Sequence, residues 1–426
     1  MCLLTAGSRS ISTPKSMLNR AKAAPKNQFF DILSYPSGYW VQRHCFIDHL
    51  KKLVRKLKAT TMKRRNFSKS LAASAALLGL SPIFSCTPAQ RSLKILVLGG
   101  TDFLGPAVVK AALQNGHQVT LFNRGITNPA LFSQLPLIRG DRENGASAYE
   151  ALKKTSWDVV IDVWPQQSQL VKEATTALRS HTAHYIFISS VAVYKDFNAT
   201  GRSEDYPLVS LPEDHKTWEY PEEKAASEAL IADQFADNHT ILRPGPIKGW
   251  RDPAYDLLYW LIKLKRNESI LCPGEGQDVL QFIDVNDVGR FAIKAAENKI
   301  VGAYNCVGPG REHLSWRAFM ESAKLHLSSE SELIWASRSA LQEHQVYPWS
   351  DLPLWAPTSD DFFMEISNTK ALSAGFSYAA LEKTIDDCLG WHKEQGDKNI
   401  LFGQGDDAVG LERAKELAVI TALKKS

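Results

Sequence analysis

The sequence predicts an α/β fold built on a doubly wound parallel sheet, with a smaller lobe towards the C-terminus. Three features predict it: an apolar strand at 93–98, a glycine-rich turn at 99–105, and a helical pattern that ends near Asn115. Further strand patterns recur between helical patterns, at 118–122, 158–163, 185–189 and 239–242. Strands that alternate with helices form a parallel sheet whose two faces the helices cover.

Length and composition limit the class of protein. Of the 426 residues, 44% are hydrophobic, which is enough for a full core and excludes disordered and fibrous chains. Cys272, Cys306 and Cys388 are too far apart in sequence to suggest a zinc or redox pair, so we expect buried free thiols. His181 and His184 lie in the loop before a strand and match no metal-binding spacing. We therefore predict no metal site.

Charge is distributed unevenly along the chain. Residues 1–90 hold 15 Lys and Arg but only two acidic residues, Asp31 and Asp48. The remaining residues hold 35 basic and 44 acidic side chains, so the body of the protein carries a net charge of −9. Because binding to phosphates requires clustered cations, we expect no nucleic acid partner.

The basic leader contains a segment that resembles a twin-arginine export signal. Met62 opens the sequence Met-Lys-Arg-Arg-Asn-Phe-Ser-Lys, and an apolar run of 14 residues follows from Leu71 to Phe84. A helix needs about 20 apolar residues to span a bilayer, so this run fits a signal better than a permanent anchor. The resemblance implies the twin-arginine export machinery as a partner and a periplasmic location.

Two features of the leader refine this expectation. Ile83-Phe84-Ser85-Cys86 resembles a lipoprotein cleavage site, so a lipid anchor at Cys86 facing the periplasm and an unmodified exported protein are both open. Export signals are not normally read from inside a chain. We therefore expect translation to start at Met62, which makes 62–90 the signal and 1–61 a doubtful extension.

The body divides into a core and a lobe. We expect the core at 91–245, because the regular alternation of strands and helices loosens after Pro244. Residues 246–400, rich in Trp, Tyr and Pro, would form mainly a substrate lobe, with segments at about 281–310 returning to the core. A C-terminal helix is expected within 401–426.

The glycine-rich turn predicts a cofactor site. Glycines let backbone N–H groups and the helix N-terminus approach a pyrophosphate, as in Rossmann dinucleotide-binding domains. Gly99, Gly100 and Gly105 fill this role, whereas Asp102 stands where the usual middle glycine would be. The strand before the turn and the helix after it favour NAD(P) binding over a merely structural turn.

The end of the second strand favours NADP. An acidic residue there normally binds the ribose 2′-OH of NAD, but this chain has Asn123-Arg124. An arginine without a carboxylate suits the 2′-phosphate of NADP. After a third short strand, Asp141 is either an acceptor for the adenine amino group or a solvated surface residue.

A Tyr-x-x-x-Lys spacing predicts a catalytic pair. Tyr220 and Lys224 are four residues apart, on one face of a helix whose first turn tolerates Pro221. A tyrosine can act as acid and base near neutrality only if nearby positive charge stabilises its phenolate. Ser190, after the strand at 185–189, would add a hydroxyl donor. The predicted cofactor-binding residues are Gly99, Gly100, Thr101, Asp102, Phe103, Leu104, Gly105, Asn123, Arg124, Asp141 and Lys224.

Together these motifs resemble the extended short-chain dehydrogenases, the NAD-dependent epimerase/dehydratase family, over residues 93–312. I-S-S-V-A-V-Y at 188–194, L-R-P-G at 242–245 and F-I-D-V-N-D-V at 282–288 match its later motifs. The first maps Ser190 onto the family's catalytic Ser or Thr. The turn and F-N-R-G at 122–125 resemble an atypical branch that includes chloroplast RNA-binding relatives.

Departures from the family restrict the substrate. Family 4,6-dehydratases carry Asp-Glu after the catalytic hydroxyl residue, whereas this chain has Val191-Ala192, which disfavours dehydration. UDP-galactose 4-epimerase-like members place an Arg before the F-I-D-V motif, whereas this chain has Leu280-Gln281. We therefore expect a sugar or glycoside rather than a nucleotide sugar. The candidate substrate contacts are Lys248, Trp250, Arg251, Asp252, Tyr259 and Trp260, although a core role is favoured over substrate contact for any single aromatic one.

We thus expect an NAD(P)-dependent epimerase or oxidoreductase with a tightly held cofactor, since no pool outside the cytoplasm would replace it. The alternative is a non-catalytic Rossmann protein that binds a nucleotide or RNA. The acidic body and the Ser-Tyr-Lys set argue against that alternative. A homodimer is left open.

Overall fold

The computed structural model describes residues 91–164, 166–214, 216, 218–310, 314–396, 400, 402–404 and 408–425. Residues 91–426 form one compact unit. The segment that resembles a twin-arginine signal, Cys86 and residues 1–61 lie outside the described residues. Within the described ranges, no helix is long and apolar enough to span a membrane.

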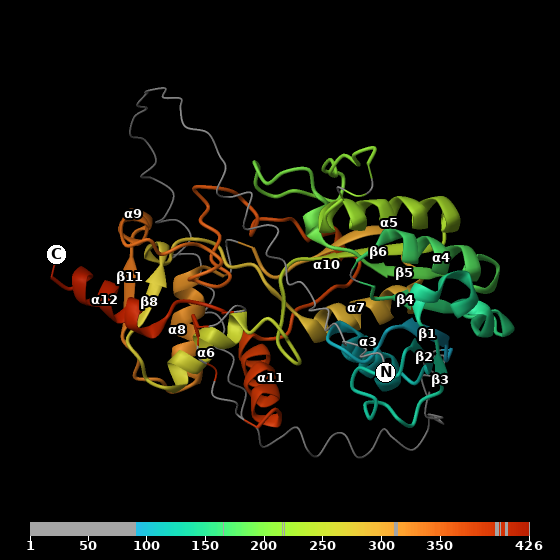
Figure 1. The fold of residues 1–426 in the computed structure, drawn as a ribbon, viewed down its shortest axis with the longest axis horizontal. Helices are drawn as coiled ribbons and strands as arrows, with labels where there is room; N and C mark the ends of the chain where they lie inside the picture. The colour runs from blue at the N-terminus through green and yellow to red at the C-terminus, as the bar shows by residue number, and fades with distance from the viewer. Residues whose placement is uncertain are drawn as a thin grey trace, which may run out of the picture. The chain divides into compact units, whose positions relative to one another are not determined.

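A seven-stranded sheet forms the centre of the unit, and every neighbouring pair of strands is parallel (Figure 1). The strand order is β10-β6-β5-β4-β1-β2-β3. The bounds are β1 Lys94–Leu98, β2 Gln118–Asn123, β3 Leu137–Arg139, β4 Val159–Asp162, β5 Tyr185–Ile188, β6 His239–Pro244 and β10 Gly302–Cys306. This confirms the predicted doubly wound α/β fold.

Helices cover both faces of this sheet (Figure 1). One face carries α3 (Leu104–Gln114) and α7 (Val285–Asn298), and the other carries α4 (Ser168–Leu178) and α5 (Tyr220–Phe235). Alternating residues of β1 serve the two faces: Ile95 and Val97 pack in the same cluster as α3 and α7, while Leu96 packs in the cluster of α4 and α5. A strand buried on both faces reads as a continuous apolar run, which is why 93–98 was recognisable.

Gly289 lets α7 lie close to α3. A Cβ at this position would come within 2.7 Å of the carbonyl carbon of Ala107. The order of the strands reverses between β1 and β4, so their carboxyl ends open a crevice where ligands bind in such sheets. After β6 the chain makes a short pair, β7 (Ile247–Lys248) with β9 (Ile283–Asp284), before α7 and β10 return to the sheet.

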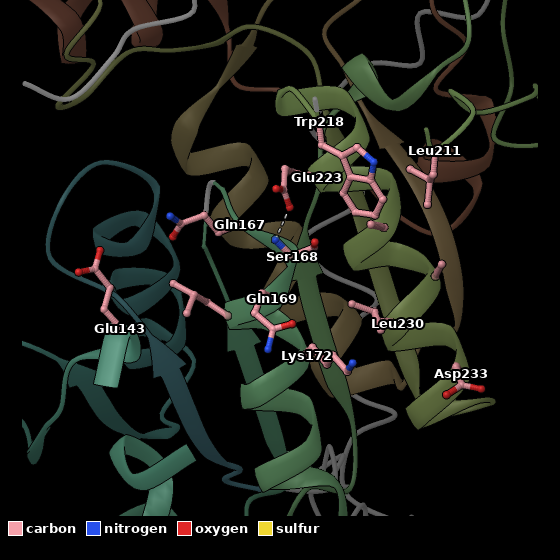
Figure 2. A pocket seen from close by; sticks show the side chains of 13 residues that line it. Glu143, Gln167, Ser168, Gln169, Lys172, Leu211, Trp218, Glu223, Leu230 and Asp233 are labelled. Atoms are coloured by element: carbon pink, nitrogen blue, oxygen red, sulfur yellow. Dashed lines mark hydrogen bonds between the residues drawn. The ribbon is translucent and has the colours of Figure 1, made fainter. Parts of the chain in front are cut away.

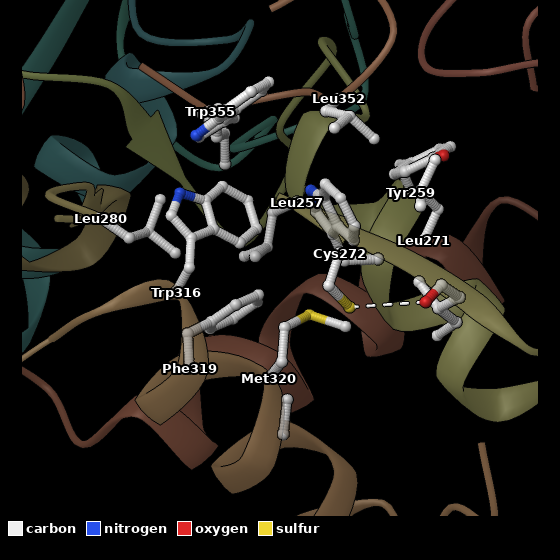
Figure 3. Packing of buried hydrophobic residues seen from close by; sticks show 14 of the residues in the cluster. Leu257, Tyr259, Leu271, Cys272, Leu280, Trp316, Phe319, Met320, Leu352 and Trp355 are labelled. Atoms are coloured by element: carbon white, nitrogen blue, oxygen red, sulfur yellow. Dashed lines mark hydrogen bonds between the residues drawn. The ribbon is translucent and has the colours of Figure 1, made fainter. Parts of the chain in front are cut away.

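The second lobe has its own apolar core, separate from the two clusters of the sheet (Figure 3). Its aromatic side chains include Tyr259, Trp316 and Trp355, each at most 1% exposed. Cys272, Cys306 and Cys388 are buried free thiols, as predicted. The elements outside the main sheet are α6 Asp256–Lys265, β8 Ile270–Pro273, α8 Trp316–His326, β11 Leu333–Ala336, α9 Arg338–Glu343, α10 Thr369–Ser373, α11 Leu381–Glu394 and α12 Arg413–Leu423.

Candidate active site

The glycine-rich turn lies between β1 and α3 and is sterically closed to side chains. Gly99 and Gly100 have φ of 114° and 99°, values that other residues rarely adopt. A Cβ on Gly99 would lie 2.7 Å from Cγ2 of Val163, and one on Gly105 would lie 2.5 Å from Cα of Gly100. No side chain caps the N-terminus of α3, so its first N–H groups are available to an anion. These features fit the diphosphate of a dinucleotide.

Side-chain amides hold the turn from outside. Asn123 donates from Nδ2 to the carbonyl of Gly99 at 3.0 Å, and its Oδ1 accepts from the N–H of Gly125 at 2.7 Å. Asn128 donates to the carbonyl of Thr101 at 2.7 Å. Asn123, which we predicted to contact the cofactor, therefore uses its amide to position the turn and the loop after β2.

Two arginines lie where the second and third strands end. Arg124 is exposed, and its Nη1 lies 4.0 Å from Oδ2 of Asp141, so the structure brings these two predicted cofactor residues together. Arg139 pairs in register with Asn123, and its guanidinium occupies the space that a Cβ on Gly125 would need. Sequence reasoning missed Arg139, although aligning β2 with β3 in register would have pointed to it.

Ser190 and Tyr220 meet at the carboxyl end of β5. Ser190 follows this strand, and Tyr220 is the first residue of α5, where Pro221 falls in the first turn as expected. Burial raises the pKa of Tyr220, and its hydrogen bond with Ser190 partly offsets that rise. Without further positive charge, Tyr220 is therefore a protonated acid at neutral pH.

Lys224 is buried one helical turn after Tyr220. Its Nζ donates to the carbonyls of Trp164 and Ile188, both at 2.6 Å, and lies 5.9 Å from the centre of the Tyr220 ring. Burial lowers the pKa of Lys224 from 10.5 to about 7, although the Asp162 carboxylate partly counters this. An amine with this pKa can hold or release a proton at physiological pH.

The loop after β4 connects the glycine-rich turn with Lys224. Val163 packs against Gly99, and the next residue, Trp164, supplies a carbonyl to Lys224. Two consecutive residues of this loop therefore contact the glycine-rich turn and Lys224, the proposed catalytic lysine. This places Ser190, Tyr220 and Lys224 beside the switch point of the sheet, where a nicotinamide would reach them.

A buried ion pair supports the loop after β4. Asp162 accepts two hydrogen bonds from Arg142, at 2.7 and 2.9 Å, and one from the N–H of Trp164 at 3.0 Å. Burial alone would raise the pKa of Asp162, but Arg142 holds it below its usual value. The charged carboxylate therefore fixes Trp164, whose carbonyl binds Lys224. Asp162 and Arg142 are positioning residues that the motifs did not reveal.

A second buried ion pair lies one turn beyond Lys224. Glu228 accepts from Nε and Nη2 of Arg243, at 3.0 and 2.7 Å, and from the hydroxyl of Ser189 at 2.5 Å. Nη1 of Arg243 donates to the hydroxyl of Tyr194 at 3.2 Å. These contacts tie α5 to β5, β6 and the turn that carries Ser190, so they fix the spacing of Ser190, Tyr220 and Lys224, the candidate catalytic set.

The predicted substrate contacts are not clustered around Ser190, Tyr220 and Lys224. Tyr259 and Trp260 lie in the core of the second lobe and are fully buried (Tyr259 is labelled in Figure 3). Lys248 is buried and pairs with Asp252 at 3.3 Å and Asp256 at 2.7 Å. Burial lowers the pKa of Lys248, but the two carboxylates raise it by more, so its pKa lies above the ordinary value. These placements favour structural roles over substrate contact.

Arg251 instead lies at the glycine-rich turn, and Trp250 lies against α3, the helix that follows the turn. Nζ of Lys110, on α3, is 5.2 Å from the ring centre of Trp250. Nε of Arg251 donates to the carbonyl of Asp102 at 2.8 Å. Both residues follow β7, so the loop at the start of the second lobe contacts the glycine-rich turn through Arg251.

Leu280-Gln281 stands where UDP-galactose 4-epimerase-like members of the family that the motifs resemble have an arginine before the F-I-D-V motif, and Gln281 is the polar residue of this pair. Its side chain is buried, donates to the carbonyls of Gly308 and Ile366 at 3.2 and 3.0 Å, and accepts from the N–H of Ile366 at 3.0 Å. All of these partners are backbone groups. The residue therefore joins two segments of this chain and offers no cation to a nucleotide diphosphate.

A cavity of about 690 Å³ lies between α4 and α5 (Figure 2). Figure 2 shows Glu223 among the residues that line it, and its carboxylate accepts from the N–H of Ser168 at 2.5 Å. Residues 223, 226, 230 and 233 line it from one face of α5, whereas Tyr220, Lys224 and Glu228 lie on another. This cavity is therefore distinct from the candidate active site. Among the described residues, no group of His, Cys, Asp or Glu is arranged to hold a metal ion.

Comparison with known sequences gives a family and several relatives. Residues 95–306 match the NAD dependent epimerase/dehydratase family. The chain is 26% identical over 230 residues to the chloroplast stem-loop binding protein of 41 kDa b of Arabidopsis thaliana, covering 50% of this chain and 57% of that protein. It is 25% identical over 289 residues to the sterol-4-alpha-carboxylate 3-dehydrogenase, decarboxylating, of Mus musculus, covering 62% and 73%. The chain thus spans little more than half of the first relative.

Solved structures show the same fold. UDP-glucuronic acid 4-epimerase from Bacillus cereus in complex with NAD has a TM-score of 0.50 and 18% identity, with 71% of this chain and 99% of that chain covered. The Bordetella bronchiseptica enzyme WbmH in complex with NAD+ has a TM-score of 0.52 and 13% identity, with 72% and 100% covered. UDP-glucose 4-epimerase from Thermotoga maritima with UDP-glucose gives 0.51 and 17%, with 71% and 99% covered.

Proposed function

We propose that this chain, whose residues 95–306 match the NAD dependent epimerase/dehydratase family, is an NAD(P)-dependent enzyme that epimerises, or oxidises and reduces, a hydroxyl or ketone of a sugar-like molecule. The observation that carries the proposal is the joining of the glycine cradle to Lys224 through Val163 and Trp164. This arrangement supports the proposal because a nicotinamide bound at the turn would then lie within reach of an acid and base.

Each residue of the set has a separate task. A bound nicotinamide would supply the acceptor and donor of a hydride. The Oη of Tyr220 takes the proton from the substrate hydroxyl during oxidation and returns it during reduction. Ser190 hydrogen-bonds the same substrate oxygen. Lys224, whose pKa is lowered to about 7 by burial, stabilises the Tyr220 phenolate when charged.

The substrate class follows from what surrounds this set. Val191-Ala192 offers no acid and base for elimination of water, so the carbon skeleton would keep its hydroxyls. Leu280 and Gln281 offer no cation to a nucleotide diphosphate, because both side chains are neutral, and the Gln281 amide is already hydrogen-bonded to backbone groups. Both features support a free sugar or glycoside over the UDP-sugars named for the structural relatives.

Arg124 and Arg139 support a preference for NADP. Their guanidinium groups lie at the carboxyl ends of β2 and β3, where the adenine ribose binds in this fold. Asp141 offsets only part of their charge, since its Oδ2 is 4.0 Å from Arg124. Two cations suit a 2′-phosphate better than a neutral hydroxyl.

Export from the cytoplasm, which we also propose, would require a closed catalytic cycle. The segment from Met62 to Cys86 resembles a twin-arginine signal, and such export carries folded proteins, so the cofactor could be loaded beforehand. No pool would replace a cofactor lost outside the cytoplasm. The hydride removed from the substrate would therefore return to it within one turnover, which gives net epimerisation or paired oxidation and reduction. A reporter fused after residue 90 and started at Met62 tests export, because it should reach the periplasm only with Arg64 and Arg65 intact.

The decisive experiment is to purify the exported protein without added cofactor, denature it and identify the released molecules by mass spectrometry. We expect about one dinucleotide per chain, because nanomolar retention needs roughly 12 kcal/mol of binding free energy, against about 8 kcal/mol at micromolar affinity. The intact protein should then convert a free sugar or glycoside without added NAD(P). Protein that emerges empty and consumes stoichiometric NAD(P) would show a simple dehydrogenase instead.

A second candidate function comes from the Arabidopsis relative, whose name describes stem-loop binding. A non-catalytic protein that binds nucleotide or RNA would not need a buried Lys224 or the Glu228–Arg243 pair that fixes its helix. The net charge of −9 over residues 91–426 also opposes phosphate binding. Binding of a stem-loop RNA by the cofactor-free protein, without any turnover, would favour this candidate.

A further inference from the structure

Arg251 belongs to the second lobe but lies against the glycine-rich turn. It follows β7, and its Nε donates to the carbonyl of Asp102 at 2.8 Å. Its Cζ is 4.4 Å from the ring centre of Trp391 on α11 and 5.6 Å from that of Trp250. Its φ of 64° is unusual for a residue other than glycine. The backbone and both aromatic rings therefore hold this guanidinium in one place.

The position of Arg251 matters because Asp102 puts a carboxylate in the glycine-rich turn. It occupies the position of the middle glycine in a turn that must receive a diphosphate, and its side chain is exposed. A carboxylate there adds negative charge beside two phosphates and opposes cofactor binding. Burial lowers the pKa of Arg251, whereas the Asp102 and Glu394 carboxylates raise it, so the guanidinium and Asp102 interact electrostatically.

Two nitrogen atoms of the Arg251 guanidinium, Nη1 and Nη2, make no hydrogen bond within the part of the chain that the structure describes. Nε is the only Arg251 atom with a hydrogen bond to any residue that the structure describes. Nη1 and Nη2 thus remain available beside the N-terminus of α3, which no side chain caps. Charge-assisted hydrogen bonds from arginine to phosphate are short and strong.

We propose that Arg251 is a cofactor-binding residue, which binds the diphosphate of the dinucleotide and compensates for the charge of Asp102 at the glycine-rich turn. This inference rests on the dinucleotide-binding function proposed above. Because Arg251 comes from the second lobe and stacks against α11, it also links cofactor retention to the packing of that lobe. Arg251 then serves the cofactor rather than the substrate.

The test is calorimetric titration of the cofactor-free full chain with NAD, NADP and ADP-ribose. Arg251→Gln should raise the dissociation constant of all three about 10- to 100-fold, because a hydrogen bond to a charged group is lost. Arg251→Lys should recover part of the affinity, since it keeps the charge. Lys110→Ala is the matched control: it removes a cation that also lies on Trp250 but does not contact the turn, and should change affinity less than threefold.

A double-mutant cycle separates charge compensation from packing. Asp102→Gly should tighten binding, and in that background Arg251→Gln should cost clearly less than in the wild type. If Arg251→Gln binds NAD and NADP as the folded wild type does, or if its effect is unchanged by Asp102→Gly, the inference is overturned while the proposed function stands. If the folded wild type binds neither dinucleotide, the proposed function itself fails.

Discussion

Replacing Lys224 by Met should make the stability of the cofactor-free protein less dependent on pH. Lys224 is 3% exposed, and burial lowers the pKa of its side chain from 10.5 to about 7. Between these two values the unfolded chain binds a proton that the folded chain does not. Wild-type unfolding free energy should therefore rise with pH across this window, by at most about 1.4 kcal/mol per pH unit.

The full difference can be worked out from the same shift. Lowering the pKa of Lys224 from 10.5 to about 7 corresponds to roughly 5 kcal/mol of unfolding free energy. This stabilisation is fully present above pH 10.5 and is lost as the pH falls towards 7. Met cannot titrate, so this contribution disappears in Lys224→Met. The variant also leaves the carbonyls of Trp164 and Ile188 without their donor, at about 1–3 kcal/mol each, but that cost is the same at every pH.

Urea unfolding at constant ionic strength and at pH 7, 8 and 9 measures this effect. The free energy of unfolding of the wild type minus that of Lys224→Met should increase by about 1 kcal/mol or more at each step. Lys110→Met, at an exposed position of α3, should show a flat difference. A flat difference for Lys224→Met as well would refute the lowered pKa and, with it, the role of Lys224 as a group that titrates near neutral pH.

Three further substitutions test the rest of the site. Tyr220→Phe should reduce turnover by about 10²–10⁴-fold while cofactor binding survives, and near-normal activity would remove Tyr220 from the mechanism. Arg124→Ala should weaken NADP but not NAD in equilibrium titration, so equal losses would contradict the assignment to the 2′-phosphate. Glu228→Gln should lower the unfolding free energy by about 3–5 kcal/mol, because Arg243 would be left as an unpaired buried charge. Pairing it with Arg243→Met should restore part of that loss in urea unfolding, which an unrelated packing defect would not allow.

The sequence predicted those parts of the structure that depend on local spacing. The apolar run at 93–98 became β1, the glycines that follow became the tight turn, and Tyr220 and Lys224 share one face of α5 as four-residue spacing requires. Each of these features is determined by neighbours within a few residues. The parallel sheet followed because its strands are buried on both faces and read as apolar runs.

Interactions between distant segments could not be predicted in this way. Lys248 was a candidate substrate contact because it follows the sixth strand, but Asp252 and Asp256 bury and neutralise it. Tyr259 resembles a sugar-binding aromatic in sequence and is a core residue in the structure. Arg139 went unnoticed because its position beside Gly125 depends on the register of β3 against β2.

The switch point of the sheet explains why the site needs residues from so many segments. At the carboxyl ends of β1 and β4, Val163 limits the space at Gly99 while Trp164 orients Lys224. Asp162 holds Trp164 and is itself held by Arg142, so the lysine is positioned through a chain of buried contacts. A Tyr-x-x-x-Lys match is therefore a candidate catalytic set only where the loop after the neighbouring strand, here β4, contacts both the lysine and the glycine-rich turn. The topology, rather than the motif alone, carries the functional argument.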